Sequence, residues 1–255
     1  MKAIDLYKYL DAKIPSSLSC TWDNDGLMCC GDPNREIKKV LITLDITDRA
    51  VDKATEEGFD TIISHHPLIF KKIGAVEPSL ISAKKAIKLI KNDITAMSFH
   101  TRLDAKNGGV NDILCSLLEI KDPLPFGPVG EEMGRIGTLS SPMSLNNFCL
   151  KVKNVLGAPV IFASGCGKIV QKVALLGGDG KDFVTSALEA GADTYISGRL
   201  SYNIMEEAPE LSINLIEAGH FYTEDPVCKY LAEIVNKACP EAVTEIYNSN
   251  EIKVF

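Results

Sequence analysis

Asp60-Thr-Ile-Ile-Ser-His-His-Pro67 is the stretch of sequence that decides the fold. Its apolar, β-branched residues predict a buried strand, which ends at the proline because proline donates no hydrogen bond to a sheet. A second strand is predicted at Lys39-Val-Leu-Ile-Thr-Leu-Asp45, and the helical pattern between them can be capped by Thr47 and closed by Gly58. Strand, helix and strand in this order predict a βαβ unit with parallel strands.

The same unit is repeated later in the chain. Residues 172–197 align with residues 39–64 without a gap, and 10 of the 26 aligned positions are identical. Sequence identity that follows the order of strand and helix indicates a duplication rather than chance. We therefore predict an α/β fold made of two similar α/β halves, each with a sheet flanked by helices.

The chain has only four histidines, and each follows an apolar segment. His65 and His66 are adjacent at the end of the predicted strand, and the other two stand four residues before a carboxylate. These pairs are His100 with Asp104 and His220 with Glu224. Ligand-binding residues of α/β units lie where strands end at the carboxyl edge of the sheet. The histidines are therefore predicted to gather in a metal site.

The pattern favours two ions over one. Successive strand residues point to opposite faces, so the rings of His65 and His66 are expected to diverge. A carboxylate that binds both ions would offset their repulsion, and Asp104 and Glu224 are the candidates. Nitrogen and oxygen ligands without thiolate suit Zn²⁺, Fe²⁺ or Mn²⁺. His100 can be a ligand, a residue that orients Asp104, or a proton shuttle, and we favour the last two roles.

The charge, apolar segments and cysteines of the chain disfavour several classes of protein. A formal net charge of −7 disfavours a protein whose affinity comes from neutralising nucleic-acid phosphates. No apolar run is long enough to span a bilayer, and the first ten residues predict an amphipathic helix rather than a signal peptide. The eight cysteines show no CxxC spacing. We expect a cytoplasmic protein with reduced thiols that binds no membrane, and we do not expect nucleic acid as its partner.

A glycine- and proline-rich stretch, residues 121–130, predicts the boundary or linker between the two halves. We expect residues 1–125 to form the first half and residues 126–255 the second, with the metal site between them. The first half carries His65, His66 and Asp104, and the second carries His220 and Glu224. Within the second half, residues 145–156 predict a helix.

Four sequence motifs are specific enough to compare with a known family. They are Trp22-Asp-Asn-Asp-Gly-Leu27, Ser64-His-His-Pro-Leu-Ile-Phe70, His100-Thr-Arg-Leu-Asp-Ala105 with Gly108-Gly-Val-Asn-Asp112, and Ala218-Gly-His-Phe-Tyr-Thr-Glu224. Together they closely resemble the signatures of the Nif3-like dinuclear-metal proteins, also named GTP cyclohydrolase 1 type 2 homologues. The resemblance implies the Nif3-like fold, two divalent ions per subunit and a ring-shaped homohexamer. The metal ligands that it implies are His65, His66, Asp104, His220 and Glu224.

Two functions follow from a metal site of this kind. The first is a metal-dependent hydrolase that acts on a small molecule, a nucleotide or a phosphoester, with His100 moving protons. The second is a metal-stabilised interaction or regulatory module without catalysis. Both need metal and differ only over an open coordination position, so the sequence leaves open whether the protein is an enzyme.

The sequence departs from the family pattern at one place. Many relatives carry an acidic residue after a Thr-Gly pair and a Tyr-His shortly afterwards, whereas this chain has Ser197-Gly-Arg199 and Tyr202-Asn203. By the internal repeat, Arg199 aligns with His66. Its guanidinium suits a phosphate or carboxylate of the substrate, and a surface ion pair is the equal alternative.

Two further features are given plain structural interpretations. The single tryptophan, Trp22, lies in a predicted turn, and we interpret it as an anchor for that loop rather than as a ligand-stacking residue. The stretch Leu176-Gly-Gly-Asp-Gly-Lys-Asp182 is interpreted as a tight turn rather than as an anion cradle, because it lacks the spacing of a phosphate-binding loop.

Overall fold

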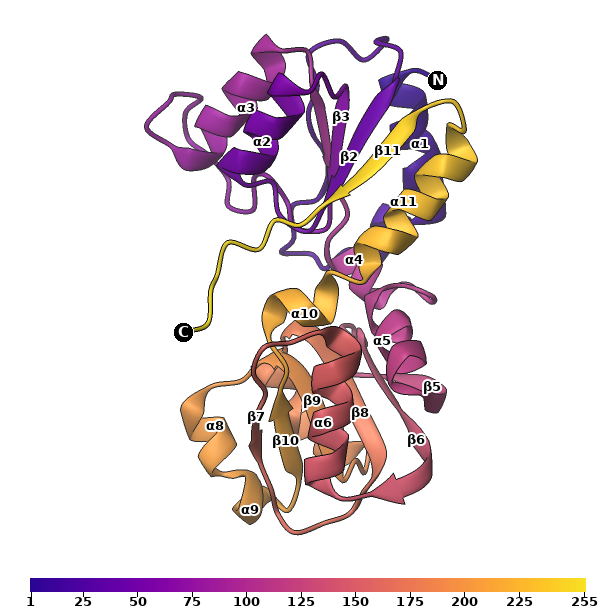
Figure 1. Ribbon diagram of the computed structural model, residues 1–255, viewed down its shortest axis with the longest axis vertical. Coiled ribbons are helices and arrows are strands. Elements are labelled where there is room, and N and C mark those ends of the chain that lie inside the picture. The colour runs from indigo at the N-terminus through magenta and orange to yellow at the C-terminus, as the bar shows by residue number, and fades with distance from the viewer. The chain divides into compact units, whose positions relative to one another are not determined.

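The structure of the chain is a computed structural model that describes residues 1–255. It confirms the α/β class, with two sheets that are each flanked by helices (Figure 1). The chain forms two compact units. The first unit consists of Met1–Leu103 and Val227–Glu251, and the second of Asp104–Pro226 and Ile252–Phe255.

The first unit is built on a five-stranded sheet with the order β1-β4-β3-β2-β11. Its strands are β1 (Gly26–Cys29), β2 (Lys39–Thr43), β3 (Thr61–Ser64), β4 (Thr95–Ser98) and β11 (Val243–Tyr247). Only β1 runs antiparallel to its neighbour. Its main helices are α1 (Ala3–Lys13), α2 (Asp48–Glu56), α3 (Ile81–Lys91) and α11 (Val227–Ala238). Helices α2 and α3 cover one face of the sheet, and α1 and α11 the other (Figure 1).

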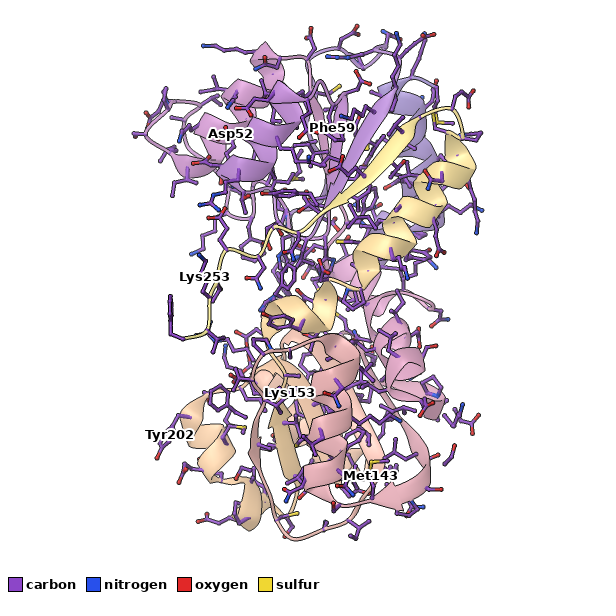
Figure 2. The ribbon with its side chains drawn as sticks, in the orientation of Figure 1. Asp52, Phe59, Met143, Lys153, Tyr202 and Lys253 are labelled. Atoms are coloured by element: carbon purple, nitrogen blue, oxygen red, sulfur yellow. The ribbon has the colours of Figure 1, made fainter.

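The predicted βαβ unit, β2-α2-β3, is confirmed, and its local interactions explain why it forms. The Thr47 hydroxyl caps α2 by accepting a hydrogen bond from the N–H of Ala50 at 3.1 Å. Apolar residues of α2 pack with the sheet in a buried core that also contains Phe59. Asp52 of α2, labelled in Figure 2, forms an ion pair with Lys88 of the neighbouring helix α3. The apolar side of α2 therefore packs against the sheet, and its charged side lies away from the sheet.

The second unit is built on a six-stranded sheet with the order β5-β6-β8-β9-β10-β7. Its strands are β5 (Ile120–Phe126), β6 (Gly134–Met143), β7 (Phe162–Ser164), β8 (Val170–Asp179), β9 (Thr194–Arg199) and β10 (Asn214–Glu217). Its helices are α5 (Val110–Leu118), α6 (Leu145–Leu156), α7 (Val184–Glu189), α8 (Tyr202–Glu206), α9 (Ala208–Leu211) and α10 (His220–Glu224). The predicted helix 145–156 is confirmed as α6, whose Phe148 and Val152 are fully buried against the sheet.

Matching hydrogen bonds confirm the duplication. The carboxylate of Asp60 accepts from the backbone N–H of Lys39 at 2.8 Å, and that of Asp193 accepts from the N–H of Lys172 at 2.6 Å. These pairs are the aligned positions of the two copies. In each copy the carboxylate ties the start of one parallel strand to the start of the next.

The equal spacing of His100 from Asp104 and of His220 from Glu224 suggests that the two histidines are equivalent in the repeat, but the strand register places them one residue apart. The register pairs Thr61 with Thr95 in the first sheet and Thr194 with Asn214 in the second. Because Thr194 is the repeat of Thr61, Asn214 corresponds to Thr95, and His100 then corresponds to Gly219. His220 instead begins α10. The equal His-to-carboxylate spacing in the two copies is therefore not a structural equivalence.

The stretch 121–130 is not a linker. Its first part belongs to β5, which pairs antiparallel with β6 at the edge of the second sheet. Prolines are tolerated there because an edge strand leaves one row of backbone groups unpaired. The chain divides at Leu103/Asp104 rather than at 125/126, and β11 returns to the first unit because it pairs with β2. None of the helices combines the length and the apolar composition that a membrane-spanning helix needs.

Candidate metal centre

His65 and His66 lie just beyond the carboxyl end of β3, as the sequence predicts. The Ser64 hydroxyl donates to the backbone carbonyl of His66 at 2.6 Å, and the N–H of His66 donates to the carbonyl of Leu44 at 2.9 Å. His65 is fully buried, whereas His66 is partly exposed. The backbone is thus held on both sides of the strand end, which fixes the directions of the two imidazoles.

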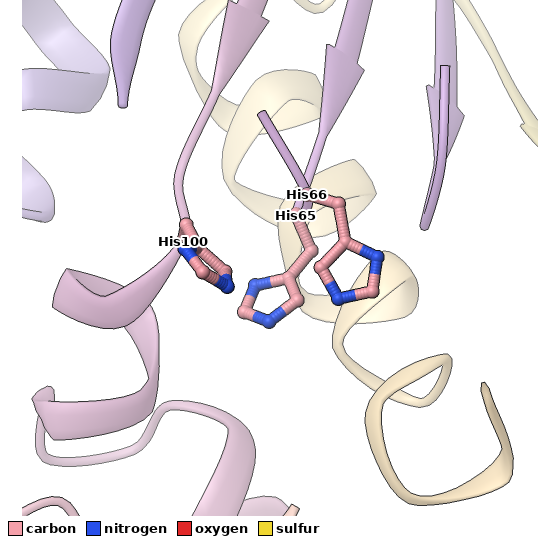
Figure 3. A group of neighbouring side chains, drawn as sticks. All are labelled: His65, His66 and His100. Carbon is pink, nitrogen blue, oxygen red and sulfur yellow. The ribbon is translucent and has the colours of Figure 1, made fainter. Parts of the chain in front are cut away.

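His100 joins these two residues from the end of the neighbouring strand β4. The imidazoles of His65, His66 and His100 face one another (Figure 3), and their candidate ligand nitrogens lie within 4.8 Å of one another. The ring centroid of His100 is 5.3 Å from that of His65 and 5.6 Å from that of His66. The first unit therefore brings together three of the four histidines, and His100 lies as close as a ligand would.

Each of the three imidazoles is anchored through Nδ1 to a protein oxygen. The partners are the Phe99 carbonyl for His65 at 2.9 Å, Asp45 Oδ1 for His66 at 2.7 Å and Asp23 Oδ1 for His100 at 2.9 Å. A carbonyl or carboxylate oxygen only accepts, so each Nδ1 carries the proton and a neutral ring keeps its lone pair on Nε2. Metal-binding histidines are oriented in this way. The residues present therefore fit a divalent ion.

Asp23 lies in the turn that starts at Trp22, and its carboxylate connects this turn to His100. Its Oδ2 accepts from the N–H of Thr101 at 3.1 Å and from the Thr101 hydroxyl at 2.6 Å. Burial opposes ionisation of this carboxyl group, but the hydrogen bonds from His100 and Thr101 outweigh it and hold the pKa of Asp23 well below its usual value. Asp23 is thus a fixed negative charge behind His100 that favours a cation on the other side of the ring.

A buried ion pair holds the same turn in place. Arg102 is 1% exposed, and its Nε and Nη2 donate to the two carboxylate oxygens of Asp25 at 2.8 Å. Asp25 Oδ2 also accepts from the N–H of His100 at 3.0 Å. A bidentate pair of this kind fixes geometry as well as charge. The Trp-Asp-Asn-Asp-Gly motif therefore holds His100 in place. Its interpretation as a turn does not include this role.

The interpretation of Trp22 as an anchor that packs its loop against the core is wrong. Its side chain is 53% exposed and lies edge-on to Phe70 and to His100, with ring centroids 6.2 and 6.4 Å apart. Asp45 was missed altogether, although it lies just beyond the carboxyl end of β2 at the position that His66 has beyond β3. Its position at the carboxyl end of a strand was the available signal.

In the second unit, His220 and Glu224 lie on one side of α10. His220 Nε2 is 2.9 Å from Glu224 Oε2, as expected for residues one helical turn apart. Glu224 is buried, with 4% exposure, and His220 is partly exposed. Thr223 fastens the helix to the sheet, because its hydroxyl accepts from the N–H of Gly178 at 3.1 Å. The predicted imidazole and carboxylate are therefore adjacent donors.

Glycines of the second sheet make room for α10. A Cβ atom at Gly178, where φ is +69°, would lie 2.1 Å from Glu224 Oε1. A Cβ atom at Gly198 would lie 2.5 Å from Thr223 Oγ1 and 2.8 Å from His220 Cα. The glycines of the stretch 176–182 thus allow β8 to pack closely against α10. This role differs from both interpretations of the stretch from the sequence, a tight turn and an anion cradle.

The last two predicted site residues occupy different surroundings. Asp104 lies on α4 (Thr101–Ala105), one turn after His100, with 7% exposure, and its backbone carbonyl accepts from the Asn111 amide at 3.2 Å. Arg199 ends β9, is exposed and forms no ion pair within the chain. The alternative of an intrachain surface ion pair for Arg199 is therefore wrong.

Comparisons with known proteins agree on one family. A protein of Clostridium perfringens named GTP cyclohydrolase 1 type 2 homolog is 33% identical over 258 residues, covering 99% of this chain and 98% of its own. The crystal structure of a Bacillus cereus protein related to NIF3 matches with a TM-score of 0.88 at 22% identity, covering 100% of this chain and 99% of that one, which shows the shared fold. Reduced HcgD from Methanocaldococcus jannaschii matches with a TM-score of 0.84 at 28% identity over 96% of this chain and 97% of its own.

The family profile described as Duf34/NIF3 (NGG1p interacting factor 3) matches residues 1–253. Because this match and the Clostridium perfringens relative both span nearly the whole sequence, the protein belongs to the Duf34/NIF3 family.

Proposed function

We propose that the protein binds two divalent metal ions and uses them to hydrolyse a nucleotide or another phosphoester. The observation that carries the proposal is the group of three imidazoles, each with Nδ1 held by a protein oxygen and with candidate ligand nitrogens within 4.8 Å of one another. The name of the Clostridium perfringens relative, GTP cyclohydrolase 1 type 2 homolog, supports a nucleotide as the substrate. The proposed ligands are His65, His66, Asp104, His220 and Glu224.

Divalent ions bound to these residues would polarise the substrate and lower the pKa of a bound water to about 7. His100 is proposed as the residue that takes up and returns a proton at Nε2, with Asp23 stabilising the charged ring through Nδ1. The edge-on rings of Trp22 and Phe70 beside His100 would exclude water from one side of the reacting group.

Arg199 is proposed to bind an anionic group of the substrate, because it is exposed and its donors are not used within the chain. Zn²⁺, Fe²⁺ and Mn²⁺ all suit the nitrogen and oxygen donors. The homohexamer and the cytoplasmic location expected from the sequence stay predictions. The alternative function, a metal-stabilised interaction module without catalysis, is favoured by the burial of His65, Asp104 and Glu224, since buried ligands also serve to order a fold.

The metal site is tested by measuring bound metal with mass spectrometry in the purified protein and in single variants. We expect about two ions per chain in the parent and a lower content in His65→Ala and in Glu224→Gln. Asp5→Asn, which changes an exposed carboxylate of α1, is the matched control and should keep the metal. An unchanged content in both site variants would rule out the proposed ligand set.

Turnover separates the two functions. The metal-loaded parent is assayed with nucleotides and phosphoesters in parallel with His65→Ala and His100→Ala. Hydrolysis that disappears in His65→Ala together with metal, and in His100→Ala without loss of metal, supports the enzyme and the proton role of His100. A parent that holds its metal but turns over none of these substrates would leave the interaction module as the function.

A further inference from the structure

A basic groove of about 710 Å³ opens in the first unit, between the segment that follows His66 and the start of α3. Its charged lining consists of Lys71, Lys72 and Lys85, and no acidic residue lines it. We propose that this groove binds the phosphate groups of the substrate, which makes that substrate a phosphorylated small molecule with more than one negative charge. The inference rests on the proposed function and specifies its substrate class.

The three ammonium groups are not neutralised by carboxylates in contact with them. Lys71 and Lys72 are exposed and make no ion pair or hydrogen bond, whereas Lys84, on the same helix as Lys85, pairs with Asp48 at 3.1 Å. The Nζ of Lys85 donates to the carbonyl of Ile46 at 2.5 Å. In a chain with a net charge of −7, a groove with three such cations is a local reversal of sign that attracts anions.

Burial lowers the pKa of Lys85, and the more distant charges of Asp48 and Asp45 oppose that shift only in part. An anion placed beside Lys85 would favour its charged form. Glu77, the only acidic residue of the segment 67–85, accepts from the N–H and hydroxyl of Ser79 and does not line the groove. The groove therefore holds positive charge that lacks a carboxylate counterion.

The start of α3 adds backbone donors to the lysines. This helix has 11 residues, and Leu80 at its N-cap supplies no side-chain acceptor. The N–H groups of the first turn of a helix have no partner within the helix, and they carry a partial positive charge. Ile81 and Ser82 of this turn line the groove. Lysine side chains and first-turn N–H groups together are the donors that phosphate oxygens need.

The groove also lies where a substrate of the proposed site would need it. Its lining begins at Pro67, the residue after His66, and includes Phe70. The ring of Phe70 lies edge-on to His100, with centroids 5.9 Å apart. A phosphorylated molecule whose reacting atom lies at the histidines can therefore place its phosphates among the lysines and pack against Phe70 on the way.

The test measures binding of inorganic triphosphate to the metal-free full-length protein by calorimetry and by the fluorescence of Trp22, the only tryptophan. We expect the double variant Lys71→Ala/Lys72→Ala to bind about tenfold more weakly or worse, because two charge-assisted contacts are lost. Lys168→Ala/Lys229→Ala, which removes the same charge from exposed positions outside the groove, should differ from the parent by less than about twofold. Equal losses in the two double variants would overturn the proposal, as would no binding to the parent.

A second measurement keeps this inference distinct from the metal site. The metal content of Lys71→Ala/Lys72→Ala should equal that of the parent. A parent that binds no triphosphate would therefore overturn the proposal for the groove and leave the proposal for the metal site unaffected. Guanosine and GTP are then compared on the metal-free parent, and GTP should bind at least about tenfold more tightly. Similar affinities for the two would show that the groove does not recognise phosphate.

Discussion

Asp45 and Asp23 orient the histidines of the site, although neither carboxylate needs to contact the metal itself. Each accepts a hydrogen bond from the Nδ1 of one imidazole, which sets the ring orientation and leaves Nε2 as the donor atom. The negative charge on the far side of the ring also favours a cation at Nε2. At the scale of single residues, the affinity for metal should therefore depend on these carboxylates as well as on the histidines.

We predict that Asp45→Ala lowers the affinity for Zn²⁺ by about 10- to 100-fold, because His66 loses its orienting partner. Asp45→Asn should lie between Ala and the parent, since its amide oxygen can still accept but carries no charge. Competition with a chelating dye measures the affinity, and Asp5→Asn serves as the control. An affinity unchanged in Asp45→Ala would mean that His66 is held by other contacts or binds no metal.

At the scale of elements, close packing of β8 against α10 requires glycine. Gly178 combines a left-handed backbone with a side-chain direction that points at Glu224, whereas Gly58, with φ of +71°, has no atom within 4 Å of a built Cβ. The two positions share the backbone strain and differ only in the close approach. They therefore form a matched pair for measuring what that approach contributes.

We expect Gly58→Ala to lower the free energy of unfolding by about 1–2 kcal/mol, the cost of a left-handed residue with a Cβ. Gly178→Ala should cost about 1–3 kcal/mol more, because Glu224 and α10 must shift. Urea denaturation followed by circular dichroism gives both values. If the two substitutions cost the same, β8 and α10 can separate without penalty and the glycine is not needed for packing.

At the scale of the whole molecule, the first unit is discontinuous in sequence. Its sheet is completed by β11, and α11 contributes buried apolar side chains from the C-terminal segment. These are Val227, Cys228, Leu231, Ala232, Ile234 and Val235. A chain that ends at Pro226 therefore contains the continuous segment 104–226 of the second unit but lacks α11 and β11 of the first.

Removal of residues 227–255 should prevent the first unit from folding. Each large apolar side chain lost from α11 is worth about 1.5–3 kcal/mol, and four of them approach the ~5–15 kcal/mol that stabilises a typical domain. Removal of the exposed residues 252–255 alone should change the melting temperature little. Thermal unfolding of both truncated proteins tests this prediction. A protein without residues 227–255 that unfolds cooperatively at the melting temperature of the parent would contradict it.

The sequence alone determined the local features of this protein. Periodicity and capping predict the βαβ unit and helix 145–156, and the repeat predicts the duplication, because these signals depend on neighbours in the chain. The same logic found His65, His66 and His100 as residues at strand ends. The motifs also identified the family that the comparisons confirm.

Only the tertiary structure decided the features that depend on pairing between distant residues. The true register of the second copy, the place of stretch 121–130 in an edge strand and the return of β11 to the first sheet all follow from strand pairing. The anchoring of His66 by Asp45 and His100 by Asp23 likewise joins residues 21 and 77 positions apart. A sequence records which residues are present, but contacts over such separations exist only once burial and hydrogen bonding have offset the entropy of closing the chain between them.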